Sequence, residues 1–296
     1  MAVRTAAVGF VGLGNMGSIL AANLVASGFE VVTHDVAGAE RNPDGAAFAA
    51  DVTDVAARSD VVVLSLPDGD VSQQVCESLA GAEMRRVTHV VDTSTIGIDA
   101  ARRIDDLLAR AGIGYVDAPV SGGLAGARAR TLSVMVAGTE AACAAVDAVL
   151  AGLSDRRRRV GGRPGMAQAL KLANNFLSAT ALAATSEAVA FGLSVGLDMG
   201  TMLDVLNASS GQSAATSDKF VNHVLTGRYA SGFANSLMAK DLRLYLGAVG
   251  DQGAPSVLGE VTATIWERFA AVEPGVDFTR IYPFVEGSEE RRVDER

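Results

Sequence analysis

The sequence predicts a two-domain protein with an α/β amino-terminal half and an all-α carboxy-terminal half. Apolar strand patterns recur as far as residue 137, with helical patterns between the early ones, which favours a parallel sheet covered on both faces. After Gly165 only long helical patterns follow. The chain has 296 residues, of which 49% are hydrophobic and 20% charged, enough for two domains with sizeable cores.

The expected elements follow in order along the chain. Strand candidates are short apolar runs at residues 6–11, 30–35, 60–66, 87–92, 114–119 and 132–137. Helical patterns in the first half cover residues 15–27, 51–58, 70–80 and 98–111. Those in the second half cover residues 166–194, 198–208, 213–226, 235–252 and 255–272. We therefore expect domains at 1–164 and 165–285, with the charged residues 286–296 as a flexible tail.

Composition excludes several classes of function. The net charge is −9, from 25 basic and 34 acidic residues, which disfavours binding to a nucleic-acid backbone. No uninterrupted apolar run approaches the roughly 18 residues of a membrane span. The two cysteines, Cys76 and Cys143, favour a reducing compartment, and we expect a cytoplasmic protein. The three histidines are scattered without metal-ligand spacing, so no metal site is expected.

A glycine-rich loop follows the first predicted strand and opens a helix. Residues 12–17 form a GxGxxG pattern of Gly12, Leu13, Gly14, Asn15, Met16 and Gly17. In this context the first glycine permits the tight turn, the second lets a pyrophosphate approach, and the third lets the helix pack closely on the strand. The helix N-terminus then offers N–H groups to the phosphates. The pattern predicts a dinucleotide-binding Rossmann domain.

Asp35 ends the second predicted strand and favours NAD over NADP. A carboxylate at this place can accept hydrogen bonds from the adenosine ribose hydroxyls and would repel a 2′-phosphate. No arginine follows directly, although Arg41 lies a few residues farther along the chain.

Six motifs in register give the sequence a family resemblance. They are GFVGLGNMG (9–17), LSLPD (64–68), DTST (92–95), DAPVSGG (117–123), KLANN (171–175) and MAKDL (238–242). With these motifs the sequence resembles the β-hydroxyacid dehydrogenases, which include 3-hydroxyisobutyrate dehydrogenase and tartronate semialdehyde reductase. The resemblance implies a Rossmann domain, a long linking helix and a helical domain that often helps to build an oligomer. It also implies reversible NAD(P)-dependent oxidation of a small 3-hydroxy acid to its semialdehyde.

The resemblance further implies site residues at the matching positions. Leu66 and Pro67 would line the adenosine side of the cofactor, and Thr95 would approach the nicotinamide. Ser121, Gly122 and Gly123 would receive the substrate carboxylate. Lys171 would be the catalytic residue with Asn175 as its partner, and Lys240 would lie near nicotinamide and substrate.

The expected chemistry needs a group that moves a proton. Oxidation of an alcohol sends a hydride to the nicotinamide and a proton to a base, and a lysine can serve if burial lowers its pKa. Asn174 and Asn175 follow Lys171 by three and four residues, so all three share one helix face. Asp241, next to Lys240, is expected to fix local structure rather than to react.

The sequence departs from the family pattern at two places, because Arg130 and Ala167 each occupy a position that is usually glycine. Arg130 would be strained if the backbone there needed a positive φ, and we expect a changed local turn instead. Arg128 and Arg130 are expected to be solvated, although either could reach an anionic substrate group. The arginine run 156–159 is expected to be a solvated loop before the domain junction.

Three alternatives remain open at this level. One is an aldehyde reductase for tartronate semialdehyde, succinic semialdehyde or glyoxylate; reductases for the last two tend to carry an arginine-rich NADP signature after the second strand, which is absent here. An imine reductase shares the broad fold, but usually carries Asp or Tyr in place of the lysine. A catalytically inactive NAD-binding scaffold would be expected to lose Lys171. The partner expected is a carboxylate-bearing hydroxy acid, with no nucleic acid and no membrane, in a homodimer or homotetramer.

Overall fold

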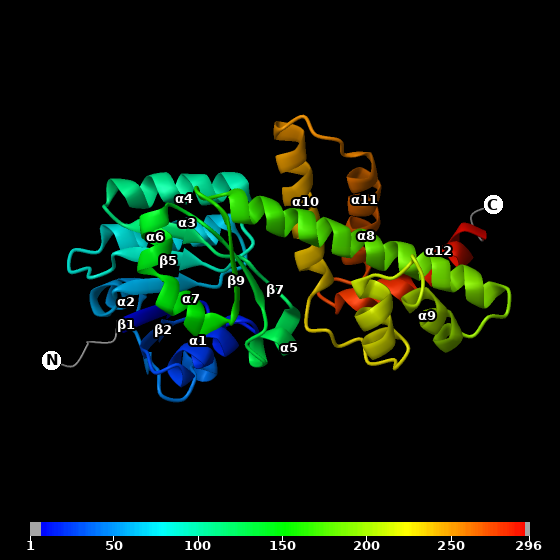
Figure 1. Cartoon of the computed structure of the whole chain (residues 1–296), viewed down its shortest axis with the longest axis horizontal. Coiled ribbons are helices and arrows are strands. Elements are labelled where there is room, and N and C mark those ends of the chain that lie inside the picture. Colours follow the sequence, from blue (N-terminus) through cyan, green and yellow to red (C-terminus); the bar gives the residue numbers. More distant parts are fainter. Residues whose placement is uncertain (1–6, 294–296) are drawn as a thin grey trace. The chain divides into compact units, whose positions relative to one another are not determined.

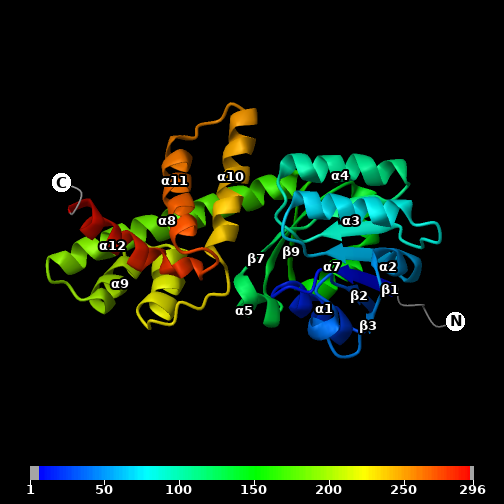
Figure 2. The same cartoon turned by 180° about the vertical axis from the view of Figure 1, so that it is seen from behind.

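The computed structural model describes residues 7–293, with side chains as far as residue 287 (Figures 1 and 2). The chain forms two compact units, the first ending at Lys171 and the second beginning at Leu172. The division falls inside the long helix α8 (Met166–Ser194), whereas the sequence placed the boundary at residues 164 and 165, just before this helix begins. Units 1 and 2 are described below in turn.

Unit 1 is built on a mixed sheet that is mostly parallel. The strands follow the order β3-β2-β1-β4-β5-β6-β8-β7, and β9 pairs with β8. Their bounds are β1 Ala7–Val11, β2 Glu30–His34, β3 Ala47–Phe48, β4 Val61–Leu64, β5 His89–Asp92, β6 Gly114–Asp117, β7 Val120–Ser121, β8 Ser133–Ala137 and β9 Arg156–Gly161. Strands β1 to β6 pair in parallel in the order of a dinucleotide-binding Rossmann fold, which confirms the predicted fold class.

Both faces of the sheet are buried, as the near-continuous apolar strands predicted. On β4, Val61 and Val63 face one core cluster while Val62 and Leu64 face the other, since side chains alternate along a strand. The helices of unit 1 are α1 Gly17–Ala26, α2 Val52–Arg58, α3 Gly69–Gly81, α4 Ile98–Arg110, α5 Gly123–Arg128, α6 Glu140–Ala145 and α7 Asp147–Leu153, with a 3₁₀ turn η1 at Ala39–Arg41. Helices α1 and α7 contribute side chains to the cluster that contains Val61 and Val63. Helices α2, α3 and α4 contribute to the cluster that contains Val62 and Leu64.

The arginine run is the first correction to the sequence analysis. Arg156 to Arg159 form most of β9, which pairs in parallel with β8, so the predicted solvated loop is wrong. The arginine side chains stay largely at the surface, and Arg157 lies 3.6 Å from the Asp147 carboxylate. The hydrogen bonds between strands are made by the backbone, so charged side chains do not prevent them. Charged side chains suit an edge strand because they oppose the addition of a further strand.

Unit 2 is helical throughout its described length. It contains the greater part of α8, then α9 Met199–Asn207, a π-helical segment η2 Ala215–Val224, α10 Asn235–Asp251, α11 Val257–Val272, a 3₁₀ turn η3 Phe278–Arg280 and α12 Ile281–Val293. An aromatic-rich core includes Trp266, Phe220 and Phe269. Helix α8 is long and apolar enough to pass a membrane-span test by composition, but Ala179, Leu182 and Val189 belong to this core, which makes α8 a core helix.

The carboxy-terminal residues are the second correction. A flexible tail was expected from residue 286, but α12 continues through Val293, and only residues 294–296 lie outside the described part of the chain. Tyr282 and Phe284 on the same helix are buried in the core of unit 2. These aromatic anchors precede the charged stretch, so the helix they start extends into residues whose composition alone suggested a coil.

The start of α8 is hydrogen-bonded to the end of β6. The Asp117 carboxylate, at the end of β6, accepts hydrogen bonds from the Gly165 and Gln168 N–H groups through Oδ2, both at 3.1 Å. Burial raises the pKa of the Asp117 carboxyl to about 7; the two backbone N–H groups oppose this shift, and the nearby Asp92 carboxylate adds to it. Asp117 therefore caps the first turn of α8, and this cap requires a carboxyl group to be buried.

This buried carboxyl predicts a pH dependence of stability. Because its pKa is raised on folding, the folded protein retains a proton that the unfolded chain releases between about pH 4 and 7, so the Asp117 contribution weakens as pH rises through this window. The Asp117→Asn variant can still accept both N–H bonds but does not titrate. We expect the free energy of unfolding of the wild type, relative to Asp117→Asn, to fall from about pH 5 to about pH 8 in urea titrations. If the free energy of unfolding changes with pH in the same way in both proteins, the raised pKa of the Asp117 carboxyl is contradicted.

Candidate active site

The glycine loop between β1 and α1 has the shape that a dinucleotide needs. A Cβ atom on Gly12 would lie 2.3 Å from the Ser65 carbonyl oxygen, and one on Gly17 would lie 1.9 Å from the Gly12 carbonyl oxygen. Gly12 also has a φ of 98°, so both positions require glycine. A Cβ on Gly14 would meet nothing within 4 Å, so its backbone is open to close approach. Asn15 and Met16 complete the turn before α1, whose N-terminus favours phosphate.

Asp35 lies directly after β2 and is bonded to the glycine loop. One carboxylate oxygen accepts a hydrogen bond from the Leu13 N–H, and the other accepts one from the Ala37 N–H at 2.7 Å. A carboxylate has about four lone-pair sites, so these two bonds leave acceptor capacity for the hydroxyls of a ribose. Arg41 donates to the Asn15 side-chain oxygen at 2.9 Å, which puts a guanidinium beside the same loop.

The loops after β4 and β5 are joined by hydrogen bonds. The Leu66 N–H donates to the Ser94 hydroxyl at 2.8 Å, next to Pro67 on one loop and Thr95 on the other. Ser94 in turn donates its backbone N–H to the buried Asp92 carboxylate at 2.9 Å. Burial raises the pKa of the Asp92 carboxyl. The predicted cofactor-lining residues Leu66, Pro67 and Thr95 thus lie on two loops that are fixed to each other at the carboxyl edge of the sheet.

Ser121 ends β7, and Gly122 joins it to Gly123, the first residue of α5. Both β6 and β7 pair antiparallel to β8, so this turn also leaves the sheet at a carboxyl end. Gly122 has a φ of 134° and Gly123 a φ of 66°, values that favour glycine and turn the chain sharply. A serine followed by two glycines at such a turn is a chemistry suited to a carboxylate.

Lys171 lies near the start of α8 and is buried, with only 8% of its surface exposed. An exposed surface lysine is the ordinary case, so this burial distinguishes Lys171 from a solvated helix charge. It is three residues beyond Gln168, which is bonded to the loop after β5.

Asn175, Asp241 and Lys240 form a polar cluster in unit 2. The Asn175 amide donates to the Asp241 carboxylate at 2.6 Å, and the Lys240 ammonium lies 3.3 Å from the other oxygen of that carboxylate. Asn175 and Asp241 are both buried. The Asp241 carboxylate therefore joins α8 to α10 and orients the other two side chains, which agrees with a structural role for Asp241.

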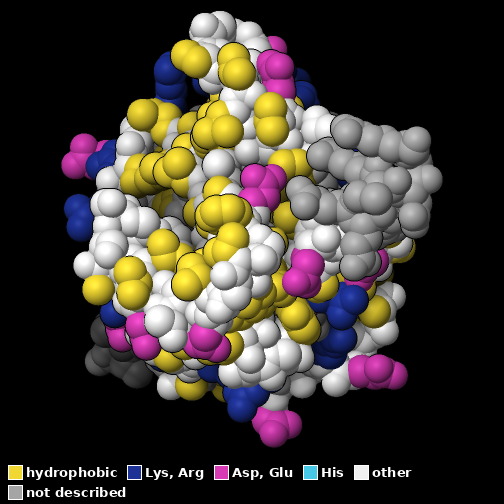
Figure 3. All heavy atoms as spheres, turned by 90° about the vertical axis from the view of Figure 1, so that its right-hand side faces the viewer, with side chains coloured by type: hydrophobic (Ala, Val, Ile, Leu, Met, Phe, Trp, Pro, Cys, Tyr) yellow, Lys and Arg dark blue, Asp and Glu magenta, His cyan; other side chains and the backbone are white. Residues whose placement is uncertain are grey.

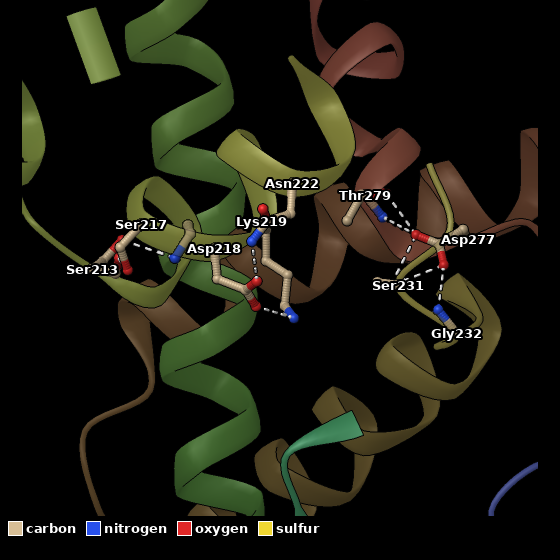
Figure 4. A network of polar contacts seen from close by, with 10 residues as sticks. Ser213, Ser217, Asp218, Lys219, Asn222, Ser231, Gly232, Asp277 and Thr279 are labelled. Atoms are coloured by element: carbon tan, nitrogen blue, oxygen red, sulfur yellow. Dashed lines mark hydrogen bonds and ion pairs between the residues drawn. The ribbon is translucent and has the colours of Figure 1, made fainter. Parts of the chain in front are cut away.

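The segments before α10 are fixed by a second polar network (Figure 4). Asp277 accepts hydrogen bonds from the Ser231 hydroxyl, the Gly232 N–H and the Thr279 N–H, and so joins the loop before α10 to η3. On the π-helical segment η2, Lys219 lies 2.6 Å from Asp218 and packs over the Phe278 ring. This network gives α10, which carries Lys240, a defined starting point.

Arg128 and Arg130 have different environments. Arg130 has a φ of 57°, so the backbone keeps the strained left-handed conformation and the changed turn that the sequence favoured is wrong. Its guanidinium donates to Ser27 Oγ at 2.7 Å and to the Ala151 carbonyl at 3.0 Å, so the side chain stabilises the ends of α1 and α7. Arg128 instead lines a shallow pocket beside the glycine loop, together with Asn15 and Arg41.

Family models match nearly the whole described chain. Residues 7–162 match the NAD-binding domain of 6-phosphogluconate dehydrogenase, and residues 165–285 match the NAD-binding model of NADP-dependent 3-hydroxyisobutyrate dehydrogenase. The chain belongs to the β-hydroxyacid dehydrogenase family. Its members' reaction class makes this protein an NAD(P)-dependent oxidoreductase that acts on a CH–OH group.

Individual members of the family support the same assignment. The mitochondrial 3-hydroxyisobutyrate dehydrogenase of Drosophila melanogaster is 32% identical, with 93% of this chain and 88% of that protein covered. The 2-(hydroxymethyl)glutarate dehydrogenase of Eubacterium barkeri is 34% identical, with 90% of each covered. The 3-hydroxyisobutyrate dehydrogenase of Mycobacterium tuberculosis, solved with L-serine, superposes with a TM-score of 0.86 at 31% identity and covers 95% of this chain and 99% of that one.

Sequence reasoning missed the residues that hold the family's motifs in place. Asp117 lies within the DAPVSGG motif and Gln168 stands three residues before the lysine, yet neither was singled out. The i, i+3 spacing of Gln168 and Lys171 was the available signal. No group of three or more His, Cys, Asp or Glu side chains within the described residues could hold a metal ion.

Proposed function

We propose that this enzyme catalyses the reversible NAD-dependent oxidation of a small 3-hydroxy acid to its semialdehyde, with Lys171 as the general acid and base. The observation that carries the proposal is the burial of Lys171 near the first turn of α8, which is bonded to the carboxyl edge of a dinucleotide-binding sheet. Ligands bind at this edge in open α/β sheets, so a lysine fixed there can act on a bound substrate.

The residues at the loop fit a dinucleotide, and we propose NAD rather than NADP. The backbone of Gly14 is open to a pyrophosphate, and the N-terminus of α1 lies beside it. Asp35 presents a carboxylate where a 2′-phosphate would add two negative charges, which would be repelled. Bound NAD supplies the hydride acceptor, and the chemistry left to the protein is that of the proton and of substrate orientation.

Each remaining side chain has a proposed task. Neutral Lys171 takes the hydroxyl proton as the alcohol becomes a carbonyl, and the ammonium returns it in the reverse direction. Ser121 with Gly122 and Gly123 receives the substrate carboxylate, and Thr95 lies toward the nicotinamide. Asn175, held by Asp241, orients the substrate, and the Lys240 ammonium favours an anionic one.

Relatives narrow the substrate class. The names 3-hydroxyisobutyrate and 2-(hydroxymethyl)glutarate, and the L-serine in the mycobacterial structure, share one feature: a CH₂OH group on the carbon next to a carboxylate. We propose that this chain acts on a 3-hydroxypropanoate with a substituent at carbon 2. In these acids the hydroxyl and the carboxylate are a fixed number of bonds apart. A turn that binds the carboxylate, with a lysine at the hydroxyl, suits this separation. The substituent at carbon 2 then distinguishes one member of the class from another.

We also propose that the enzyme is a cytoplasmic homo-oligomer. Cys76 and Cys143 are both free and buried, which suits a reducing compartment. Figure 3 shows hydrophobic side chains spread over the face of unit 2 turned to the viewer. Most large hydrophobic side chains that are exposed in the described residues belong to unit 2, among them Leu177, Phe191, Val195, Val205 and Val257. Apolar surface of this extent usually contacts another protein surface, and a second copy is the partner that we propose.

The proposed function predicts the effect of removing the lysine. In Lys171→Ala, kcat should fall by about 10²–10⁴-fold because the proton loses its acceptor, while the NADH dissociation constant should change by less than about threefold. The control is Lys219→Ala, which removes a partly buried lysine that is paired with Asp218. Steady-state kinetics and NADH fluorescence titration measure the two quantities. Near-normal kcat in Lys171→Ala would refute the assignment.

The second prediction concerns cofactor choice. Asp35→Ala removes the carboxylate and should lower the ratio of kcat/KM with NAD to kcat/KM with NADP by about tenfold or more. Asp44→Ala, an exposed aspartate on the loop after η1, is the matched control. If the ratio is the same in all three proteins, Asp35 does not contact the ribose.

The third prediction concerns assembly. Phe191 is 69% exposed in unit 2, so Phe191→Lys should shift the protein toward the monomer in sedimentation velocity. Met84→Lys changes a side chain that is 82% exposed in unit 1 and should leave the assembly intact. A wild type that sediments as a monomer would contradict the proposed oligomer.

A further inference from the structure

We propose that Gln168 is a positioning residue that fixes Lys171 relative to the loop carrying Thr95, and so sets the rate of the hydride step. The inference rests on the proposed function, because it takes Lys171 as the proton-transfer group. Gln168 itself does not touch substrate or cofactor in this account. It acts through the lysine that follows it by one helical turn.

The side-chain amide of Gln168 is hydrogen-bonded to the backbone on both sides of Thr95. Its oxygen accepts hydrogen bonds from the Ile96 N–H at 3.0 Å and the Gly97 N–H at 3.2 Å. Its nitrogen donates to the Ser94 carbonyl at 3.1 Å. These partners stand on both sides of Thr95 in the sequence, so one amide fixes the backbone that carries this threonine. The Gln168 side chain is fully buried, and such bonds are costly to leave unmade.

The backbone of Gln168 is fixed as well. Its N–H donates to the Asp117 carboxylate, which also accepts from the Gly165 N–H. The first turn of α8 is therefore bonded to the loop after β5 through the Gln168 side chain and to the end of β6 through Asp117. Together these contacts define both the rotation and the axial position of the helix at this point.

The position of Lys171 is set by the first turn of α8. Residues three apart on an α-helix are neighbours on one face, with Cβ atoms about 5–6 Å apart. A slip of one residue along the helix would rotate the lysine by about 100° and move it by about 1.5 Å. Misplacement of a catalytic group by about 1 Å can cost about 10²-fold in rate. The bonds of Gln168 prevent such a slip on the side of the helix that carries the lysine.

The experiment compares two variants with a control. Gln168→Leu removes all three side-chain bonds at similar volume. Gln168→Glu keeps an acceptor for Ile96 and Gly97 but loses the donor to Ser94. Gln74→Leu changes an exposed glutamine on α3 and is the control. For each protein the measurements are kcat, the NADH dissociation constant, the melting temperature and the deuterium isotope effect with substrate labelled at the carbinol carbon.

We expect kcat to fall by about 10–100-fold in Gln168→Leu and by less in Gln168→Glu. The NADH dissociation constant should stay within about threefold, because the glycine loop is untouched. The isotope effect on kcat should increase, since hydride transfer becomes slower relative to product release. A merely structural role would lower stability without raising the isotope effect.

Two results would overturn the inference. One is an unchanged kcat in Gln168→Leu. The other is a loss of kcat that follows a loss of NADH affinity and melting temperature, with an unchanged isotope effect. If Gln168→Leu fails to fold, Gln168→Glu decides between the same outcomes. Failure of the proposed function would look different, because Lys171→Ala would then retain wild-type turnover or the wild type would oxidise no hydroxy acid.

Discussion

The candidate site depends on the hydrogen bonds that join the first turn of α8 to the loop after β5 and to the end of β6. A helix that begins in unit 1 and continues through the core of unit 2 carries both Lys171 and Asn175. Its starting position is set by Asp117 and Gln168, two buried polar residues whose hydrogen bonds are made within unit 1. Buried polar groups are costly unless paired, so this arrangement has one well-defined geometry and few near alternatives.

The rest of unit 1 supports the same edge of the sheet. The loop after β1 is hydrogen-bonded to the loop after β2 through Leu13 and Asp35, and the loop after β4 to that after β5 through Leu66 and Ser94, so the proposed cofactor-binding residues lie on two pairs of joined loops. In unit 2 the Asp241 carboxylate holds Asn175 and pairs with Lys240. Asn175 and Lys240 are thus oriented by a neighbour to which no reactive role is assigned.

The sequence predicted what local patterns determine and missed what long-range contacts determine. The apolar strands, the glycine loop and the span of α8 follow from periodicity and turn chemistry. A changed local turn was expected at Arg130, but the backbone keeps a positive φ there, because the turn geometry is set by the surrounding fold. Strand β9 was missed because four arginines have no apolar pattern, and its pairing to β8 comes from the fold. Helix α12 was missed because its charged end follows buried aromatic anchors. The bond from Asp117 to Gln168 joins residues far apart in the sequence, and periodicity carries no information about such pairs.

The most direct test of the account is NADH formation from a panel of acids, each with NAD and with NADP. The panel contains 3-hydroxyisobutyrate, 2-(hydroxymethyl)glutarate, L-serine, D-glycerate and 3-hydroxypropionate, with 4-hydroxybutyrate as the acid whose hydroxyl is one carbon too far. The account predicts turnover of at least one 2-substituted 3-hydroxypropanoate, faster with NAD, and little with 4-hydroxybutyrate. Tight NADH binding without turnover of any acid would contradict it and would make this chain a dinucleotide-binding protein without the proposed chemistry.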